Sequence, residues 1–216
     1  MQLRRHERGD TLIEVLFAIA VFSMVVVGSV AIMNVGTAAA QRTLGLTVMR
    51  QVIDSQAQML RLAHDSYLAQ YSPSAPTSSY TGAAALYATI EQKAAETPGS
   101  SFIGSTQCPN SGTGAPTLRA NSFVMYSPAT GSNLVLDWLG SNQTPDTYPT
   151  VTVDSTGRPV VQGIWVEAVK QPVELTANPK VPVGYIDFHI NACWPGPGSN
   201  VPVTIGTIVR LYDPAE

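Results

Sequence analysis

The sequence predicts an α+β protein in which a long N-terminal helix packs on an antiparallel β-sheet. All 16 prolines lie from Pro73 onward, and none occurs in residues 10–71. Because a proline inside a helix costs about 3 kcal/mol, the first part of the chain can form one continuous helix and the second part cannot. The second part contains several runs of alternating apolar and polar residues with no helical pattern between them, which favours antiparallel pairing.

The N-terminal part of this helix is long and apolar enough to cross a membrane. Residues 11–33 read TLIEVLFAIAVFSMVVVGSVAIM and carry a single charge, that of Glu14. A bilayer core about 30 Å thick needs about 20 apolar residues in a helix. Arg4, Arg5 and Arg8 precede the segment, so the positive-inside rule places the N-terminus in the cytoplasm.

An ordinary secretory signal peptide is the alternative interpretation of the same segment. Such a peptide has an apolar core of about 7–15 residues followed by small residues at its cleavage site. The small residues Ala38, Ala39 and Ala40 offer such a site. This alternative predicts that the whole apolar helix is removed.

The residues around Gly9 resemble a known processing motif. Residues 8–16 read RGDTLIEVL, with Gly9 five residues before Glu14 and the apolar run after it. This pattern resembles the cleavage motif of type IV prepilins and pseudopilins. The resemblance implies cleavage after Gly9 by a membrane peptidase, a new and usually methylated N-terminus at Asp10, and retention of the apolar helix.

Glu14 is the most informative residue of this motif. A carboxylate inside a membrane span costs about 2.5–3.5 kcal/mol on insertion scales, so such a residue is usually functional. The resemblance implies that Glu14 pairs with the terminal ammonium of a neighbouring subunit and sets the register of assembly. Alternatively, Glu14 lies near the lipid headgroups.

Two departures from the family pattern favour a minor or specialised pilin. Asp10 stands where the family usually has Phe, which places a carboxylate beside the new N-terminal amine and changes the local charge at the site of methylation. The segment also lacks the proline that many major pilins carry in the membrane part of the helix.

The second half of the helix carries an apolar stripe that predicts packing on a domain core. Its members recur at three- and four-residue spacing: Met49, Val52, Ile53, Leu60, Ala63 and Tyr67. Gln56 interrupts the stripe, and we expect His64 on the polar side. The helix is expected to end near Tyr71.

The expected organisation is therefore a leader, residues 1–9, a long helix, residues 10–71, whose transmembrane part is 11–33, and a globular head, residues 72–216. In the head we expect a short helix at 83–96. The expected strands lie at 122–126, 133–139, 150–154, 160–169, 185–194 and 203–212, with hairpins at PATGS and STGRP.

The two cysteines, Cys108 and Cys193, are expected to form a disulfide in an exported head, although two free buried thiols remain the alternative.

Asp187, His189 and Cys193 share one face of a predicted strand, but catalytic triads usually draw their members from different elements. No CxxC, HExxH or GxSxG pattern occurs. We therefore expect no enzyme, no catalytic residue, no metal and no cofactor.

The expected function is that of a structural subunit of a type IV pilus or related filament, polymerising through its N-terminal helix. The resemblance implies other pilin subunits, the prepilin peptidase and a membrane assembly platform as partners, with membrane lipid around the precursor and a cell-surface filament afterwards. A net charge of −3 argues against nucleic acid. A minor pseudopilin of a type II secretion system and a membrane-anchored surface binding domain that never polymerises are the alternatives.

Overall fold

The computed structural model describes most of the chain outside several loops. The described residues are 10–74, 76–95, 107–109, 117–128, 133–139, 150–153, 159–176, 181–196 and 201–213. The predicted leader, residues 1–9 with Gly9, therefore lies outside the described residues.

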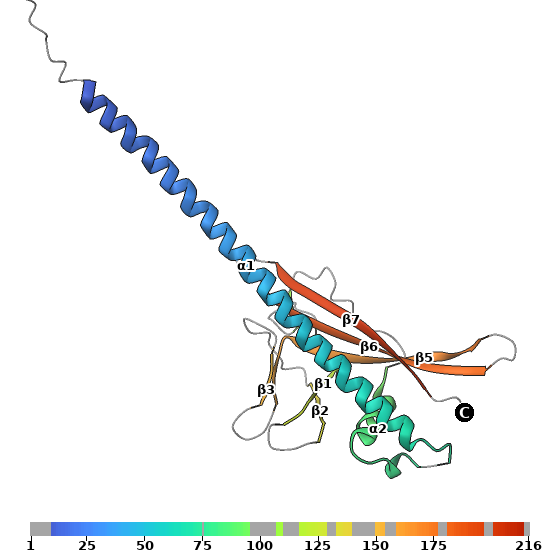
Figure 1. Cartoon of the computed structure of the whole chain (residues 1–216). Helices are drawn as coiled ribbons and strands as arrows, with labels where there is room; N and C mark the ends of the chain where they lie inside the picture. Colours follow the sequence, from blue (N-terminus) through green and yellow to red (C-terminus); the bar gives the residue numbers. More distant parts are fainter. Residues whose placement is uncertain are drawn as a thin grey trace, which may run out of the picture. The chain divides into compact units, whose positions relative to one another are not determined.

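The elements follow the predicted order, with one long helix before a group of strands (Figure 1). The helices are α1 (Asp10–Gln70), the 3-10 turn η1 (Thr77–Ser79) and α2 (Ala83–Lys93). The strands are β1 (Phe123–Tyr126), β2 (Val135–Trp138), β3 (Thr150–Val153), β4 (Pro159–Gln162), β5 (Ile164–Thr176), β6 (Val181–Pro195) and β7 (Pro202–Tyr212).

The chain divides into two compact units between Leu44 and Gly45, inside α1. The first unit contains the N-terminal part of α1. The second unit contains the remainder of α1 together with α2 and all the strands, and we call it the head.

The head is built on a five-stranded antiparallel sheet with the strand order β2-β1-β5-β6-β7. The predicted hairpin at PATGS joins β1 and β2, and the one at STGRP joins β3 and β4, which form a separate two-stranded sheet. The antiparallel prediction is confirmed.

The prediction of a single strand over residues 160–169 is wrong. Gly163 has a φ of 61°, a backbone conformation that favours glycine, and it separates β4 from β5. Its carbonyl accepts a hydrogen bond from the Cys193 N–H at 2.8 Å, so the turn is fixed against β6. The short helix also ends earlier than predicted, because Ala94 is extended and Ala95 forms a bridge with Val169 of β5.

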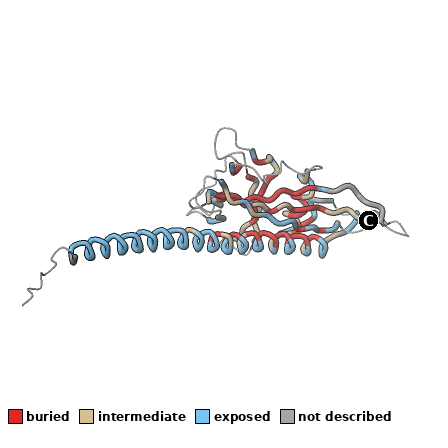
Figure 2. The backbone as a smooth tube through the Cα atoms, turned by 90° about the horizontal axis from the view of Figure 1, so that it is seen from above, coloured by how far each residue is buried: buried red, intermediate tan, exposed pale blue. Residues whose placement is uncertain are grey.

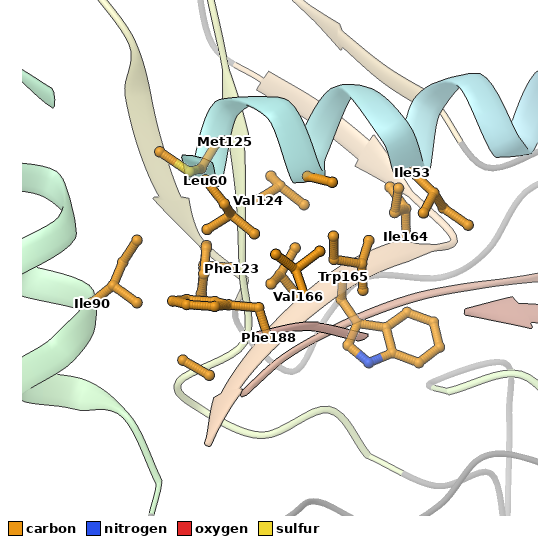
Figure 3. Packing of buried hydrophobic residues seen from close by; sticks show 14 of the residues in the cluster. Ile53, Leu60, Ile90, Phe123, Val124, Met125, Ile164, Trp165, Val166 and Phe188 are labelled. Atoms are coloured by element: carbon orange, nitrogen blue, oxygen red, sulfur yellow. The ribbon is translucent and has the colours of Figure 1, made fainter. Parts of the chain in front are cut away.

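One face of the sheet, which we call the inner face, carries the apolar side chains that form the core with α1. On β6 the buried members are Ile186, Phe188, Ile190 and Ala192, as their alternation predicts. Figure 3 shows Ile53 and Leu60 of α1 directed toward Val124, Met125, Ile164 and Val166 of the sheet.

The predicted stripe on α1 is confirmed. Met49, Ile53, Leu60, Ala63 and Tyr67 are buried, and Val52 is half-buried. The fold class predicted from the sequence, a long N-terminal helix packed on an antiparallel sheet, is therefore confirmed.

Candidate functional site

The N-terminal part of α1 is an unusual surface, because its large apolar side chains are exposed. From Leu12 to Leu44 their exposed fractions run from 43% at Val26 to 80% at Met24. Figure 2 shows this part of the helix as exposed along its length, whereas a buried stripe appears from Gly45 onward. Exposed apolar surfaces of this extent mark contact with a membrane or with other proteins.

Among the described residues, one helix is long and apolar enough to cross a bilayer, and its apolar part is this exposed segment. The hydroxyl groups of the segment are satisfied within the helix. Ser23 Oγ donates to the Ile19 carbonyl at 2.7 Å, and Ser29 Oγ donates to the Val25 carbonyl at 2.8 Å. These serines can therefore remain in lipid or in a helix–helix contact without an outside partner.

Glu14 differs from these serines, because a carboxylate cannot be satisfied by carbonyl groups of its own helix. Its side chain is exposed, and it makes no hydrogen bond or ion pair among the described residues. A carboxylate inside an apolar segment is costly and usually functional, so Glu14 is the candidate functional side chain of this surface.

The predicted cleavage site is adjacent to this segment. Asp10 is the first residue of α1, and its side chain is not among those described. Gly9 lies outside the described residues, so the structure does not bring Gly9, Asp10 and Glu14 together as a site.

The C-terminal half of α1 is fixed to the sheet by two buried polar residues, whose partners the sequence does not indicate. Gln56, interpreted as a break in the apolar stripe, is buried and makes two hydrogen bonds with the backbone of Met125. His64, expected on the polar side, is buried, and its Nε2 lies 2.9 Å from the Tyr212 carbonyl oxygen. The prediction for His64 was wrong because a polar residue at a buried helical position was assigned to the surface.

The two cysteines form the predicted disulfide, Cys108–Cys193, with the Cα atoms 5.6 Å apart. Cys193 belongs to the β6 residues that point away from α1, on what we call the outer face of the sheet. The disulfide therefore attaches the segment around Cys108 to that face.

The cluster of Asp187, His189 and Cys193 on the outer face does not form a nucleophilic site. Cys193 is bound in the disulfide. The Asp187 carboxylate accepts two hydrogen bonds from Arg210 of β7, from Nε at 2.8 Å and from Nη2 at 2.9 Å. These bonds raise the pKa of the Arg210 guanidinium, and they pair the Asp187 carboxylate with β7.

Comparison with known proteins supports the N-terminal motif. Residues 4–30 match the family model described as the prokaryotic N-terminal methylation motif. This match covers Gly9, Glu14 and most of the exposed apolar segment, and the motif is typical of type IV pilins and pseudopilins. The chain is a type IV pilin-like protein.

No curated protein and no solved structure matches the chain. The match to known sequences is thus confined to the N-terminal part of this pilin-like protein, and the head is described by its structure alone. The exposed helix is consistent with a membrane-anchored prepilin.

Proposed function

We propose that this pilin-like protein is a structural subunit of a type IV pilus or a related filament and catalyses no reaction. The observation that carries the proposal is the exposed apolar part of α1 with the single carboxylate of Glu14, inside the matched motif. Such a helix is suited first to lipid and then to a core of neighbouring helices.

The precursor spans the membrane through α1, with the head on the far side. A peptidase hydrolyses the Gly9–Asp10 peptide bond, which produces a carboxylate on Gly9 and a new ammonium group on Asp10. Methylation of this amine leaves it basic, so its positive charge is retained. The predicted leader, residues 1–9, departs with its arginines, while α1 is kept intact.

In the filament, the apolar segments of many subunits pack together, and Glu14 pairs with the Asp10 ammonium of a neighbour. An unpaired carboxylate in this core is strongly unfavourable, because removing one partner of a buried ion pair costs about 3–5 kcal/mol. The pair therefore favours one axial register of assembly over the others. The membrane assembly platform and other pilin subunits are the partners in this step.

The experiment that tests this proposal compares Glu14→Gln with Ser23→Ala, which replaces a polar residue in the same exposed segment. Glu14→Gln should still be inserted and cleaved, but filament-associated subunits sheared from cells should fall at least about tenfold, equivalent to about 1.4 kcal/mol. Ser23→Ala should assemble normally, because its hydroxyl contacts only its own helix. Immunoblots of sheared and membrane fractions measure both outcomes.

Unchanged assembly of Glu14→Gln would show that the Glu14 pair does not direct assembly, and absence of the wild-type protein from the sheared fraction would favour a membrane-anchored domain that never polymerises. Loss of cleavage in the variant would assign Glu14 to processing and not to assembly. The amount of protein in the membrane fraction separates these outcomes from simple degradation.

A further inference from the structure

β7 is an edge strand, and one of its sides has no strand partner among the described residues. The Asp213 N–H donates to the Gly184 carbonyl of β6 at 2.9 Å. Because backbone groups alternate along a strand, those of Ile205, Thr207 and Val209 also face β6. The N–H and C=O groups of Thr204, Gly206 and Ile208 therefore point away from the sheet.

This open edge is limited at both ends. The Tyr212 carbonyl, which points in the same outward direction, is occupied by His64 Nε2 of α1 at 2.9 Å. At the other end, Pro202 has no N–H to donate. The open part of the edge is therefore residues 203–209.

The open edge lacks the features that usually prevent strand pairing. Natural edge strands carry charged residues, proline or bulges for this purpose. Residues 203–209 read VTIGTIV, without a charge and mostly β-branched, and the Ile208 side chain is 59% exposed. Uncharged segments of six or seven residues with high β-propensity are those that pair readily with another strand.

A groove of about 490 Å³ lies along the same strand. Trp165, His189, Asn191, Thr204, Gly206 and Ile208, all on the outer face, line it together with neighbouring residues of β6 and β7, and no lining side chain is an acid, lysine or arginine. Gly206 has no side chain to fill it, and a Cβ there would lie 2.6 Å from Asn191 Oδ1. The groove is suited to an uncharged apolar side chain beside an added strand.

We propose that the β7 edge pairs with β7 of a second copy of this chain, antiparallel and with the two-fold axis at Gly206. In this register Gly206 lies opposite the partner's Gly206, and Thr204 lies opposite the partner's Ile208. The partner's Ile208 then enters the groove beside Gly206. Its large side chain fills the space that is open because Gly206 has no side chain.

The edge permits this register and disfavours the registers with the axis at Ile208 or Thr204. A two-fold axis at Ile208 would require the Tyr212 carbonyl, which His64 already occupies. An axis at Thr204 would place Gly206 opposite Pro202, which has no N–H. With the axis at Gly206, the only charged residue of the strand, Arg210, lies opposite the partner's Pro202, so no like charges meet.

This pairing sets the direction of the joined copies. The two-fold axis is perpendicular to the sheet, so it reverses any direction within the sheet plane, including that of α1 residues 45–70 on the inner face. Paired copies therefore have this part of α1 running in opposite directions. If the proposed function holds, the contact joins subunits of two filaments with opposite directions.

The first test measures amide hydrogen exchange of the full chain in detergent micelles, with residue resolution. The probe is a synthetic peptide with the sequence of residues 202–210 followed by two lysines for solubility. Millimolar peptide should slow exchange at Thr204, Gly206 and Ile208 by about tenfold or more, because these amides gain hydrogen bonds. The amides of Ile205, Thr207 and Val209, already bonded to β6, should not change.

The control is the same peptide methylated on the backbone nitrogens that correspond to Thr204, Gly206 and Ile208. This peptide cannot donate to β7 and should give no protection. Equal protection by both peptides, or no protection by either, would overturn the proposed pairing.

The second test uses filaments and compares Ile208→Lys with Val160→Lys, an exposed substitution on β4 away from the edge. Wild-type and Val160→Lys filaments should associate laterally in electron micrographs, and Ile208→Lys filaments should remain single. Equal association in all three would contradict the inference. Absence of filaments in all three would count against the proposed function, while the exchange experiment would still decide the pairing.

Discussion

Gln56 takes the place of a strand along one side of β1. β1 pairs with β5 only at Phe123, opposite Val166, so the backbone of Met125 has no strand partner there. The Gln56 side chain supplies both missing bonds: its Nε2 donates to the Met125 carbonyl at 2.7 Å, and its Oε1 accepts from the Met125 N–H at 2.9 Å. A primary amide presents the same donor and acceptor as a peptide group.

Gln56→Ala should lower the free energy of unfolding by about 2–4 kcal/mol, because two buried backbone groups lose their partners. Gln58→Ala, on the exposed side of the same helix, is the matched control and should change stability by less than about 0.5 kcal/mol. Denaturant unfolding of the full chain in detergent measures both. Equal effects of the two substitutions would show that the Met125 contacts do not stabilise the fold.

Asp213 is a carboxyl group whose environment disfavours its charge. Burial raises the pKa of its carboxyl group above the ordinary value of 3.8, and the Glu91 carboxylate raises it further, against the opposing effects of Lys170 and His64. Its Oδ1 is buried without a hydrogen-bond partner among the described residues. The folded head therefore binds this proton more tightly than the unfolded chain does.

Because of this difference, the contribution of Asp213 to stability falls as the pH rises from its ordinary pKa through its folded pKa. Asp213→Asn, which keeps the neutral form, should raise the free energy of unfolding near pH 7 by up to about 1 kcal/mol. The gain should vanish toward pH 4, where the wild-type carboxyl is also protonated.

Thermal unfolding of both proteins at several pH values measures the difference. Asp54→Asn, on the exposed side of α1, controls for the loss of one negative charge. A gain that stays constant with pH would contradict the assignment to the Asp213 proton.

At the scale of elements, α1 combines two kinds of helix in one. Up to Leu44 its apolar side chains are exposed on all sides, and from Gly45 onward a single stripe is buried against the sheet. The sequence predicts this change directly, because an all-round apolar pattern turns into one with three- and four-residue spacing. The hydrogen-bond partners of buried polar side chains are harder to predict, because those of Gln56 and His64 lie 69 and 148 residues away in the sequence.

For the strands, too, the sequence predicts some features and not others. Alternation predicted β6 and β7 closely, because one face of each is buried. The break at Gly163 was missed because β4 and β5 read as one apolar run, and only the positive φ and the bond from Cys193 reveal the turn. The groove was not predicted either, since it depends on which residues of β7 lie beside Trp165 and Asn191.

The Cys108–Cys193 disulfide should stabilise the head by limiting the unfolded chain. Its sequence separation is 85, and a loop of this size corresponds to about 4–5 kcal/mol in the chain-entropy model. The Cys108→Ala/Cys193→Ala double variant should therefore unfold at distinctly lower denaturant concentration than the oxidised wild type. Wild type under reducing conditions should match the double variant, and a double variant as stable as the oxidised protein would exclude this role.

At the scale of the whole molecule, the sequence and the structure provide different parts of the evidence for function. The processing motif and Glu14 were readable from the sequence, because a glycine, a carboxylate and an apolar run stand in one short stretch. Their meaning depends on assembly, and neither Gly9 nor the Asp10 side chain is among the residues that the structure describes. The head contributes what the motif does not contain, namely the helix attachment through Gln56 and His64 and the open edge of β7.

The central claim is that the apolar helix is kept after the leader is removed. Intact-mass and N-terminal mass spectrometry of the protein recovered from the cell surface test this claim most directly. We predict a chain that begins at Asp10, with or without a methyl group on its amine. A chain that begins near residue 40, or one that still carries residues 1–9, would contradict it.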